Sequence, residues 1–252
     1  MRPVKLTDQS VIYSDEHFVA INKPAGISSV SERWSPDQKC LIDLVWDRWK
    51  IEDPNAPKPH VVHRLDKETT GVILFARHGE AQAGLRKQFM ERTTKKTYHT
   101  LVEGIPEPAH GKLIFHVEEN PAKPGTMRIN RQGKECQSEF ELLKAFDHHS
   151  WVEVRPKTGR THQVRLTMLQ TGAPCCCDSV YGSGAPLLLS TYKRSYRPGR
   201  GQEERPLLAR LGLHALRLEI QHPEDGANLV IEAPLPKDLR ASLRQLERWS
   251  RH

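Results

Sequence analysis

Pairs of short apolar runs joined by polar turns recur along this chain, and they constrain its fold more than any other feature. The first pair, Val11 to Tyr13 and Phe18 to Ile21, surrounds a polar turn and is closed by Lys23, Pro24 and Gly26. This arrangement predicts a β-hairpin. Because hairpin-linked strands run in opposite directions, a chain rich in them favours an antiparallel sheet.

The same pattern predicts further strands. A continuous apolar run, Val72 to Ala76, is typical of a strand buried on both faces. The segment "KTYHTLVEG" alternates, with Tyr98, Thr100 and Val102 on one face. Two more hairpins are predicted, "SEFELLKAF" with "WVEVRP" across the turn "DHHS", and "LHALRLEI" with "NLVIEAP" across "HPEDGA".

Apolar residues at helical spacing predict three amphipathic helices. The inward residues are Leu41, Leu44, Val45 and Trp49 in the first, then Ala81, Leu85 and Phe89, and finally Leu239, Leu243, Leu246 and Trp249. Strands and helices do not alternate in a βαβ rhythm. The chain is therefore expected to form a single α+β domain over residues 1–252, with a mostly antiparallel mixed sheet flanked by helices and loops.

A shorter helix is predicted within "KTGRTHQVRLTMLQTG". Thr161 is expected to be its N-cap and Gly172 its stop. Thr161 and Arg165 would then share one face, with Arg165 about one turn inside the helix.

The composition is that of a folded, moderately basic protein. Lys and Arg number 38 against 31 Asp and Glu, which gives a net charge of +7. Such an excess of basic residues indicates solubility. Only a cluster of these residues would indicate a polyanionic partner. No apolar stretch approaches the roughly 20 residues that cross a bilayer, and "MRPVKLTDQS" lacks the apolar core of a secretory signal. A cytoplasmic location is therefore expected.

The cysteines favour a role in packing. The chain has five, at Cys40, Cys136, Cys175, Cys176 and Cys177. An odd count with three adjacent residues argues against a disulfide framework. The run "PCCCD" lacks the spacing of a zinc site, so no metal is expected and small buried side chains are the favoured interpretation.

Three polar clusters lie at strand edges or at the start of a helix: "HRLD" at residues 63–66, Tyr98, and "GRTHQVR" at 159–165. These residue types can form an active site, in which Asp66 is a nucleophile, Arg165 keeps it ionised and Tyr98 moves a proton. They can also be a turn aspartate, a strand tyrosine and a surface arginine with only local roles. The residues alone leave both alternatives open.

The order of these segments resembles the RluA-type RNA pseudouridine synthases. The similarity covers nearly the whole chain, and "HRLD" followed by a Thr-Gly step, together with "GRTHQVR", is its most specific part. The other matching segments are "IYSDEHFVAINKPAG", "KKTYHTLVEG", "GKECQSEFELL", "DSVYG", "LHALRLEIQHP" and "APLP". The resemblance implies the pseudouridine synthase catalytic fold as a stand-alone domain without an S4 domain. It also implies isomerisation of uridine in rRNA or tRNA without a cofactor.

The resemblance further implies roles for single residues. Asp66 matches the catalytic aspartate, and Arg64 matches the arginine that helps to displace the target base. Tyr98 matches the tyrosine that stacks on the uracil, Arg165 the basic residue that pairs with the aspartate, and Leu213 an apolar residue near the base. The target nucleotide must leave its stack before a carboxylate can reach its sugar.

Two positions depart from the family pattern. Thr167 stands where the family commonly has a histidine, and Cys177 where it commonly has a glycine. These positions are expected to affect packing and substrate shape. The main alternative function is a noncatalytic RNA-binding or ribosome-assembly factor, which the intact Asp66, Tyr98 and Arg165 argue against. A hydrolase that uses Asp66 on another glycoside is disfavoured, because no second acidic residue is evident that could protonate the leaving group.

A basic segment, "YKRSYRPGRGQEER" at residues 192–205, is a candidate for RNA contact. Its arginines, Arg194, Arg197 and Arg200, would neutralise phosphates, while Tyr192 and Tyr196 would stack on bases. A solvated surface loop is the alternative. RNA is the expected partner, and the protein is expected to be a monomer.

Overall fold

The computed structural model describes residues 6–31, 38–193, 195–197, 199 and 202–250. Arg194 and Arg200 of the basic segment therefore lie outside the described residues. The chain divides into two compact units, one formed by Met1–Lys96 with Ala215–Pro234 and the other by Thr97–His214 with Leu235–His252. Within the described ranges, no helix is both long enough and apolar enough to span a membrane.

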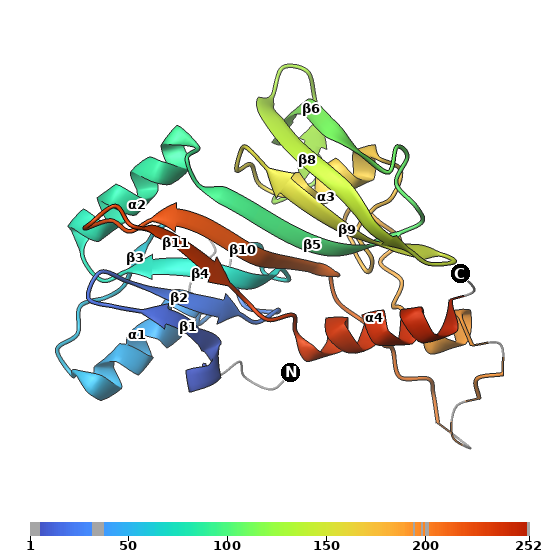
Figure 1. Ribbon diagram of the computed structural model, residues 1–252, viewed down its shortest axis with the longest axis horizontal. Coiled ribbons are helices and arrows are strands. Elements are labelled where there is room, and N and C mark those ends of the chain that lie inside the picture. Colours follow the sequence, from blue (N-terminus) through green and yellow to red (C-terminus); the bar gives the residue numbers. More distant parts are fainter. Residues whose placement is uncertain (1–5, 32–37, 194, 198, 200–201, 251–252) are drawn as a thin grey trace. The chain divides into compact units, whose positions relative to one another are not determined.

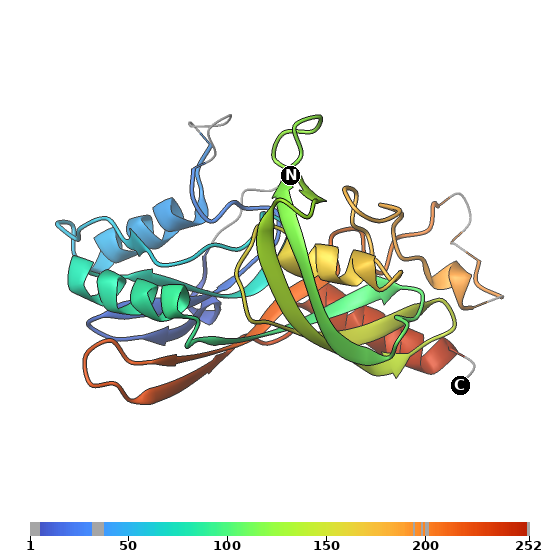
Figure 2. The ribbon, with the colours of Figure 1, turned by 90° about the horizontal axis from the view of Figure 1, so that it is seen from above.

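The first unit is a sheet with two helices on one side of it (Figures 1 and 2). Its strands lie in the order β1-β2-β4-β10, with β11 paired to β10 and β3 to β4. The strands are β1 (Val11–Ser14), β2 (Phe18–Lys23), β3 (His60–Val61), β4 (Thr70–Ala76), β11 (Asn228–Glu232) and the part of β10 (Leu213–Gln221) from Ala215 onward, and the helices are η1 (Asp8–Ser10), α1 (Leu41–Glu52) and α2 (Gly79–Glu91). The predicted β1–β2 and β10–β11 hairpins are confirmed.

The core of this unit forms around β4, which is buried along its whole length as the sequence predicts. Ala81 and Leu85 of α2 are buried against the sheet, and Phe89 packs at the edge of the same cluster. In α1 the buried face includes Ile42, whereas the predicted Leu44 is only half-buried. The apolar face of α2 thus stabilises the central strand.

Gly71 allows β4 to approach β10 closely. Its φ is +114°, and a Cβ atom there would lie 2.1 Å from the carbonyl oxygen of Ala215. Because any larger residue would collide with the neighbouring backbone, the Thr-Gly step at the start of β4 is a packing requirement.

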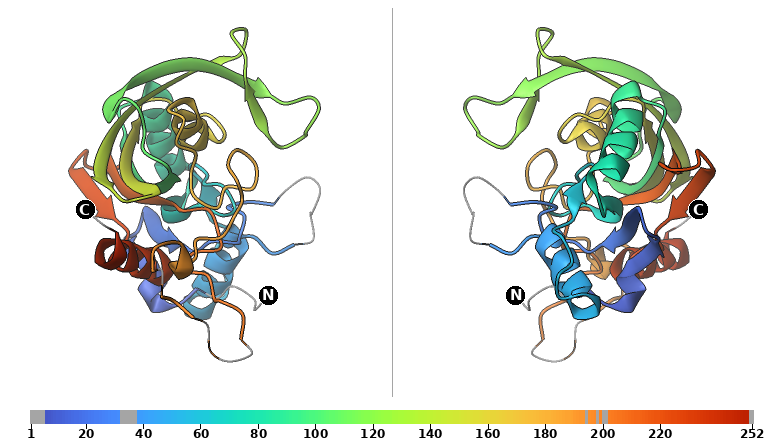
Figure 3. Two further views of the ribbon diagram at one scale, coloured as in Figure 1. Left: turned by 90° about the vertical axis from the view of Figure 1, so that its right-hand side faces the viewer. Right: turned by 90° about the vertical axis from the view of Figure 1, so that its left-hand side faces the viewer.

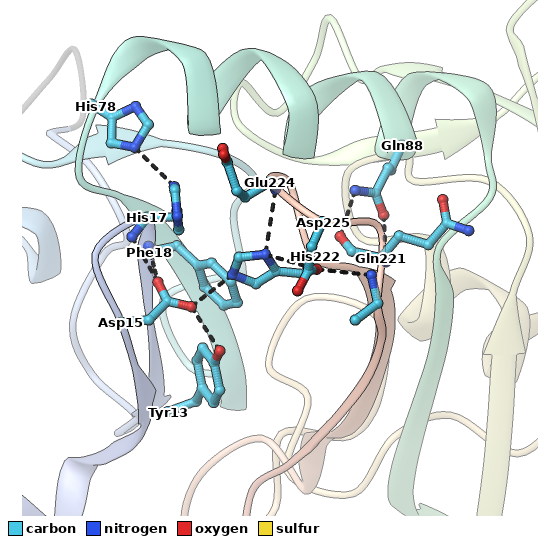
Figure 4. A network of polar contacts seen from close by, with 11 residues as sticks. Tyr13, Asp15, His17, Phe18, His78, Gln88, Gln221, His222, Glu224 and Asp225 are labelled. Atoms are coloured by element: carbon cyan, nitrogen blue, oxygen red, sulfur yellow. Dashed lines mark hydrogen bonds and ion pairs between the residues drawn. The ribbon is translucent and has the colours of Figure 1, made fainter.

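A polar network joins the β1–β2 turn to the start of the β10–β11 turn (Figure 4). The Asp15 carboxylate accepts hydrogen bonds from the Tyr13 hydroxyl at 2.7 Å and from the main-chain N–H groups of His17 and Phe18. The His222 ring lies 2.9 Å from the same carboxylate. The hydrogen bond to Asp15 raises the pKa of Tyr13 to about 12, so its hydroxyl stays protonated and donates.

The second unit is a curved antiparallel sheet around a short helix (Figure 3). Its strands run in the order β5-β9-β8-β6-β7. They are β5 (Lys95–Glu103, from Thr97 in this unit), β6 (His110–Glu119), β7 (Met127–Ile129), β8 (Lys134–Ala145) and β9 (His149–Pro156), and the helices are α3 (Gln163–Gln170), η2 (Leu189–Thr191) and α4 (Lys237–Trp249). The predicted β8–β9 hairpin is confirmed. Sequence patterns did not predict β6, where only Phe115 and Val117 are buried, or the three-residue β7.

Helix α3 packs on the strands of this unit from within their curve. Val164 and Met168 share a core with strand residues Val152 and Val154, and Leu166 packs with Phe115. Helix α4 buries Leu239 and Leu246, with Leu243 and Trp249 packed alongside as predicted.

The predicted start of α3 is wrong. The helix begins at Gln163, and its N-cap is His162 in a left-handed conformation with φ 56°, so Thr161 lies before the helix. The Gln163 side-chain oxygen accepts hydrogen bonds from the Thr158 hydroxyl at 2.7 Å and from the Arg160 N–H at 3.0 Å, which holds the preceding turn in a non-helical shape. Thr161 and Arg165 therefore do not share a helical face. Gly172, with φ 74°, follows the helix as the predicted stop.

The five cysteines are free thiols, and all are buried; for Cys175, Cys176 and Cys177 this burial was predicted. In the part of the chain that the structure describes, no group of three His, Cys, Asp or Glu side chains is placed to hold a metal ion. Cys177 has φ 59°, a conformation that glycine adopts without strain, which explains physically why a glycine suits this position.

Candidate active site

The "HRLD" segment forms the loop between β3 and β4 in the first unit. Arg64 is exposed, Leu65 is buried, and the Asp66 side chain is half-buried. The main-chain oxygen of Asp66 accepts a hydrogen bond from the Thr69 N–H at 3.1 Å, which closes a turn just before β4. The carboxylate is thus carried on a tight turn that leads directly into the most buried strand of this unit.

Lys23 supports this loop from within the protein. Its side chain is fully buried, and its ammonium group donates hydrogen bonds to three main-chain oxygens, those of Pro24 at 3.0 Å, Lys67 at 2.8 Å and Thr69 at 2.9 Å. Two of these oxygens lie within three residues after Asp66. A buried ammonium group needs such partners, and in return it fixes the path of the backbone that it binds.

Two further side chains hold the residues before Asp66. The buried Ser29 hydroxyl donates to the Leu65 oxygen at 2.8 Å and accepts from the Leu65 N–H at 3.1 Å. The His63 ring accepts a hydrogen bond from the Leu74 N–H at 3.1 Å and stacks on Phe89. Burial, with a smaller contribution from the charge of Lys96, lowers the pKa of His63 to about 3, so the ring is neutral and can accept. The loop is therefore anchored on both sides of Asp66.

The sequence interpretation missed the roles of Lys23 and Ser29. It assigned Lys23 to the polar segment that follows the first hairpin, whereas Lys23 is the last residue of β2, a strand whose apolar residues are buried. The available signal was a lysine directly continuing an apolar strand. Its three acceptors could not be found by spacing, because two of them lie more than 40 residues further along the chain.

We expect Lys23→Met to destabilise the protein by about 3 kcal/mol and to lower activity, because three main-chain oxygens lose the hydrogen bond from the buried ammonium group. Urea unfolding and turnover measure the two effects. Lys39→Met is the matched control, since Lys39 is in the same unit but its side chain is 71% exposed in an ion pair with Asp47, and surface pairs contribute less than about 1 kcal/mol. Equal effects of the two substitutions would contradict the role assigned to Lys23.

Arg165 lies in the first turn of α3 in the second unit and is 7% exposed. Its guanidinium group binds the buried Asp178 carboxylate through two hydrogen bonds, from Nε at 2.7 Å and from Nη2 at 2.6 Å. Burial alone would raise the pKa of Asp178, but the hydrogen bonds and charge of Arg165 and the N–H groups of Val180 and Tyr181 outweigh it and hold this pKa below its usual value. The pair is therefore ionised at neutral pH.

Tyr181 packs against the Arg165 guanidinium group, whose central carbon lies 4.8 Å from the ring centre. The Tyr181 hydroxyl accepts a hydrogen bond from the Met127 N–H at 2.7 Å and lies 2.8 Å from Nδ1 of His162. The ring that covers Arg165 is thus itself fixed by β7 and by the N-cap of α3.

Tyr98 and Leu213 meet in one apolar cluster of the second unit. Leu213 is buried, and Tyr98 packs at the edge of the cluster, which also contains Val164 of α3. Tyr98 lies opposite Val154 in the pairing of β5 with β9. The structure thus brings together two of the residues that the family resemblance singled out, beside the helix that carries Arg165.

The basic segment is only partly available for RNA. Arg197 is exposed, but Tyr192 is 7% exposed and packs in the core with Leu239 and Leu246. The Tyr192 hydroxyl lies 2.5 Å from Nδ1 of His149. The prediction that Tyr192 stacks on bases is therefore wrong, because its apolar ring anchors the start of the segment.

The α+β fold of this chain is one that solved RNA pseudouridylate synthases share. Residues 17–170 match the family model described as RNA pseudouridylate synthase. The chain belongs to this family, and it is an enzyme that isomerises uridine in RNA to pseudouridine.

Its relatives agree with this assignment. The dual-specificity RNA pseudouridine synthase RluA of Escherichia coli O157:H7 is 35% identical over 226 residues, which cover 89% of this chain and 92% of that protein. An uncharacterized RNA pseudouridine synthase of Mycobacterium bovis is 31% identical over 97% of this chain and 75% of its own length. The solved structure of human RNA pseudouridylate synthase domain containing 4 aligns with a TM-score of 0.75 at 25% identity, covering 95% of this chain and 93% of that one.

Proposed function

We propose that Asp66 is the catalytic carboxylate of this RNA pseudouridine synthase. The observation that carries the proposal is the anchoring of its loop, in which Lys23 binds the main-chain oxygens of Lys67 and Thr69 and Ser29 binds the main chain of Leu65, on either side of Asp66. Such main-chain anchoring fixes the position of a residue that takes part in a reaction. A capping aspartate would not require a fully buried lysine beneath the turn.

The reaction explains why a carboxylate is needed. The glycosidic C–N bond must break, the uracil must turn, and a C–C bond must form at the same sugar. In this proposal Asp66 attacks the sugar or enables loss of its 2′ proton while the nucleotide is flipped out of its stack. The exposed Arg64 fills the place that the base leaves, since its guanidinium group can stack on the neighbouring bases.

The second unit supplies the remaining proposed roles. Tyr98 stacks on the uracil and accepts a proton, Leu213 contributes apolar surface near the base, and Arg165 pairs with the catalytic carboxylate during the reaction. The support for these roles is the clustering of Tyr98 and Leu213 beside α3 together with the buried, ionised state of Arg165. An ionised arginine favours the charged form of a carboxylate that it meets.

We further propose that the substrate is a uridine in structured rRNA or tRNA and that the enzyme works as a cytoplasmic monomer. The relatives named for the ribosomal large subunit and for dual specificity support these RNA classes. Mapping pseudouridines in rRNA and tRNA from cells with and without the gene tests the proposal. Loss of one or more modified positions in either RNA class is expected, whereas unchanged maps of both classes would overturn the proposed target.

The basic segment is proposed to bind RNA phosphates through Arg194, Arg197 and Arg200. We expect their triple replacement by alanine to weaken binding to many RNAs and to reduce the slope of log affinity against log salt by roughly 0.7 to 0.9 for each phosphate that is no longer neutralised. Turnover at saturating RNA should change less. The matched control replaces the exposed Arg86, Lys87 and Arg240 by alanine, which changes the net charge equally. Identical salt slopes in the two triple variants would assign the segment to the solvated surface.

A further inference from the structure

Cys176 and Cys177 are adjacent in the chain, and their side chains meet. Their sulfur atoms lie 3.5 Å apart, and both residues belong to the apolar core of the second unit that also contains Leu208. The neighbouring Cys175 is not part of this pair. Its sulfur accepts a hydrogen bond from the Thr100 hydroxyl at 3.3 Å, and it packs in another core. The run "PCCCD" therefore contains one thiol pair and one separate thiol.

The backbone conformation at Cys177 explains why the two thiols meet. In an extended chain, adjacent side chains point to opposite sides, but Cys177 has φ 59°, in the left-handed region. The backbone before it is fixed, since the Cys176 N–H donates to the Leu101 oxygen at 2.8 Å and the Cys176 oxygen accepts from the Gly212 N–H at 2.9 Å. A cysteine at position 177 thus carries a conformational cost that a glycine would avoid.

The two thiols differ in their acidity and exposure. A hydrogen bond from Cys176 lowers the pKa of Cys177, while the same contact and burial raise the pKa of Cys176. Cys177 is 8% exposed and Cys176 1% exposed, so Cys177 is also the more accessible of the two. The thiolate is the reactive form of cysteine. A reactive thiolate beside a second thiol is the arrangement that converts a sulfenic acid into a disulfide.

Closing this pair needs an oxidant, and hydrogen peroxide can supply the oxidation. The Cys177 thiolate attacks one peroxide oxygen, the O–O bond breaks, and Cys177 becomes a sulfenic acid while the other oxygen leaves as water after taking up a proton. The Cys176 sulfur then attacks the Cys177 sulfur, the S–O bond breaks, and the hydroxyl group leaves as water with the Cys176 proton. The cysteines lose two hydrogens and two electrons in total, and one peroxide is reduced to two waters.

We propose that Cys176 and Cys177 are a peroxide-sensitive thiol pair, whose reversible oxidation to a disulfide lowers the turnover of this enzyme. A disulfide bond is about 2.05 Å long and usually joins Cα atoms about 4.4 to 6.8 Å apart. Adjacent Cα atoms across a trans peptide bond are only about 3.8 Å apart. The backbone of the pair must therefore shift when the bond forms. A disulfide strained in this way is readily reduced, so cellular thiols can reverse its formation.

The shift reaches the candidate active site through the next residue in the chain. Asp178 follows Cys177 directly, and its carboxylate binds the buried Arg165 through two hydrogen bonds. Movement of Cys177 therefore displaces the guanidinium group of Arg165. The effect on turnover rests on the proposed function of Arg165, whereas formation of the disulfide does not.

The first experiment identifies the bond in the wild-type protein. The protein is treated with hydrogen peroxide, unfolded, alkylated with iodoacetamide and digested with trypsin. The peptide 166–193, which contains all three cysteines of "PCCCD", is then fragmented in a mass spectrometer. We expect this peptide to have lost two hydrogens and to carry one alkyl group, on Cys175. A peptide that keeps both hydrogens, or a bond that includes Cys175, would overturn the inference.

The second experiment measures turnover as tritium release from RNA labelled with 5-tritiated uridine. Wild-type turnover should fall about 10-fold after peroxide treatment, since a small misplacement of a catalytic group has effects of this size. Dithiothreitol should restore it, because a disulfide is reducible whereas a sulfinic acid is not. Cys177→Gly should turn over as the wild type does and should not respond to peroxide, because glycine suits this conformation and leaves Cys176 without a partner.

The matched control is Cys175→Ala, which removes a buried thiol from the same run and should respond to peroxide as the wild type does. Thermal unfolding checks the variants, and Cys176→Ala replaces Cys177→Gly if the latter does not fold. An equal response of Cys177→Gly and the wild type would overturn the inference, as would a disulfide that leaves turnover unchanged. Full activity of Asp66→Ala would instead refute the proposed catalytic carboxylate, whereas an inactive Asp66→Ala with a peroxide-resistant wild type would refute this inference alone.

Discussion

Asp66→Ala is expected to lower turnover by roughly 10⁴-fold or more, because a methyl group cannot replace a catalytic carboxylate. The fold and the RNA affinity should remain nearly intact. The loop around Asp66 is held through its main chain by Lys23 and Ser29, so losing the side chain should cost about 1 kcal/mol of stability or less. Single-turnover kinetics, urea unfolding and RNA binding measure the three effects.

Glu68→Ala is the control for this experiment, since Glu68 is a half-buried acid in the same loop. It should keep turnover within a few-fold of the wild type. Asp66→Asn should behave as Asp66→Ala does, because an amide is neither a nucleophile nor a base at neutral pH. Turnover by Asp66→Ala near the wild-type rate would end the assignment of Asp66.

Arg165→Lys is expected to lower turnover by about 10- to 100-fold even though it keeps the positive charge. An ammonium group cannot donate two parallel hydrogen bonds to Asp178 and still present a planar edge to a second carboxylate. The measurement is turnover at saturating RNA, with circular dichroism to check the fold.

Arg210→Lys provides the comparison, because Arg210 makes the same side-on pair with Asp238 on α4. It should lose some stability but little activity. Wild-type turnover by Arg165→Lys would show that the planar guanidinium group is not required, and it would contradict the pairing role proposed for Arg165.

The strands and helices were predictable where burial follows a simple period. The continuous apolar run of β4 is a local property of the chain, so the sequence alone indicates it. Strand β5 was also predicted, but its burial does not alternate, because Thr100, Leu101 and Val102 are all buried. Strand β6 was not predicted because only Phe115 and Val117 of its residues are buried and the apolar Ile114 between two inward positions is exposed, which breaks the apolar alternation in the sequence. The start of α3 was misplaced because the Gln163 side chain, bonded to Thr158 and Arg160, decides where the helix begins.

In the candidate site, the sequence indicated the proposed reacting residues but not the residues that hold them in place. Asp66 and Arg165 were found by motif, and their residue types suggested their chemistry. Their supports were not found, because the partners of a side chain depend on tertiary structure. Lys23 binds the oxygens of Lys67 and Thr69, and Arg165 binds Asp178, at separations in sequence that no local period encodes. Both supports bury charged groups, which sequence patterns assign by default to the surface.

The most direct test of the central claim is the release of tritium from RNA labelled with 5-tritiated uridine, because forming the C–C bond displaces the hydrogen at C5. RNA from cells without the enzyme is incubated with the purified wild-type protein and, separately, with Asp66→Ala. The account predicts release by the wild type and none above background by Asp66→Ala, with similar RNA binding by both. Equal release by the two proteins, or RNA binding without release by the wild type, would contradict it.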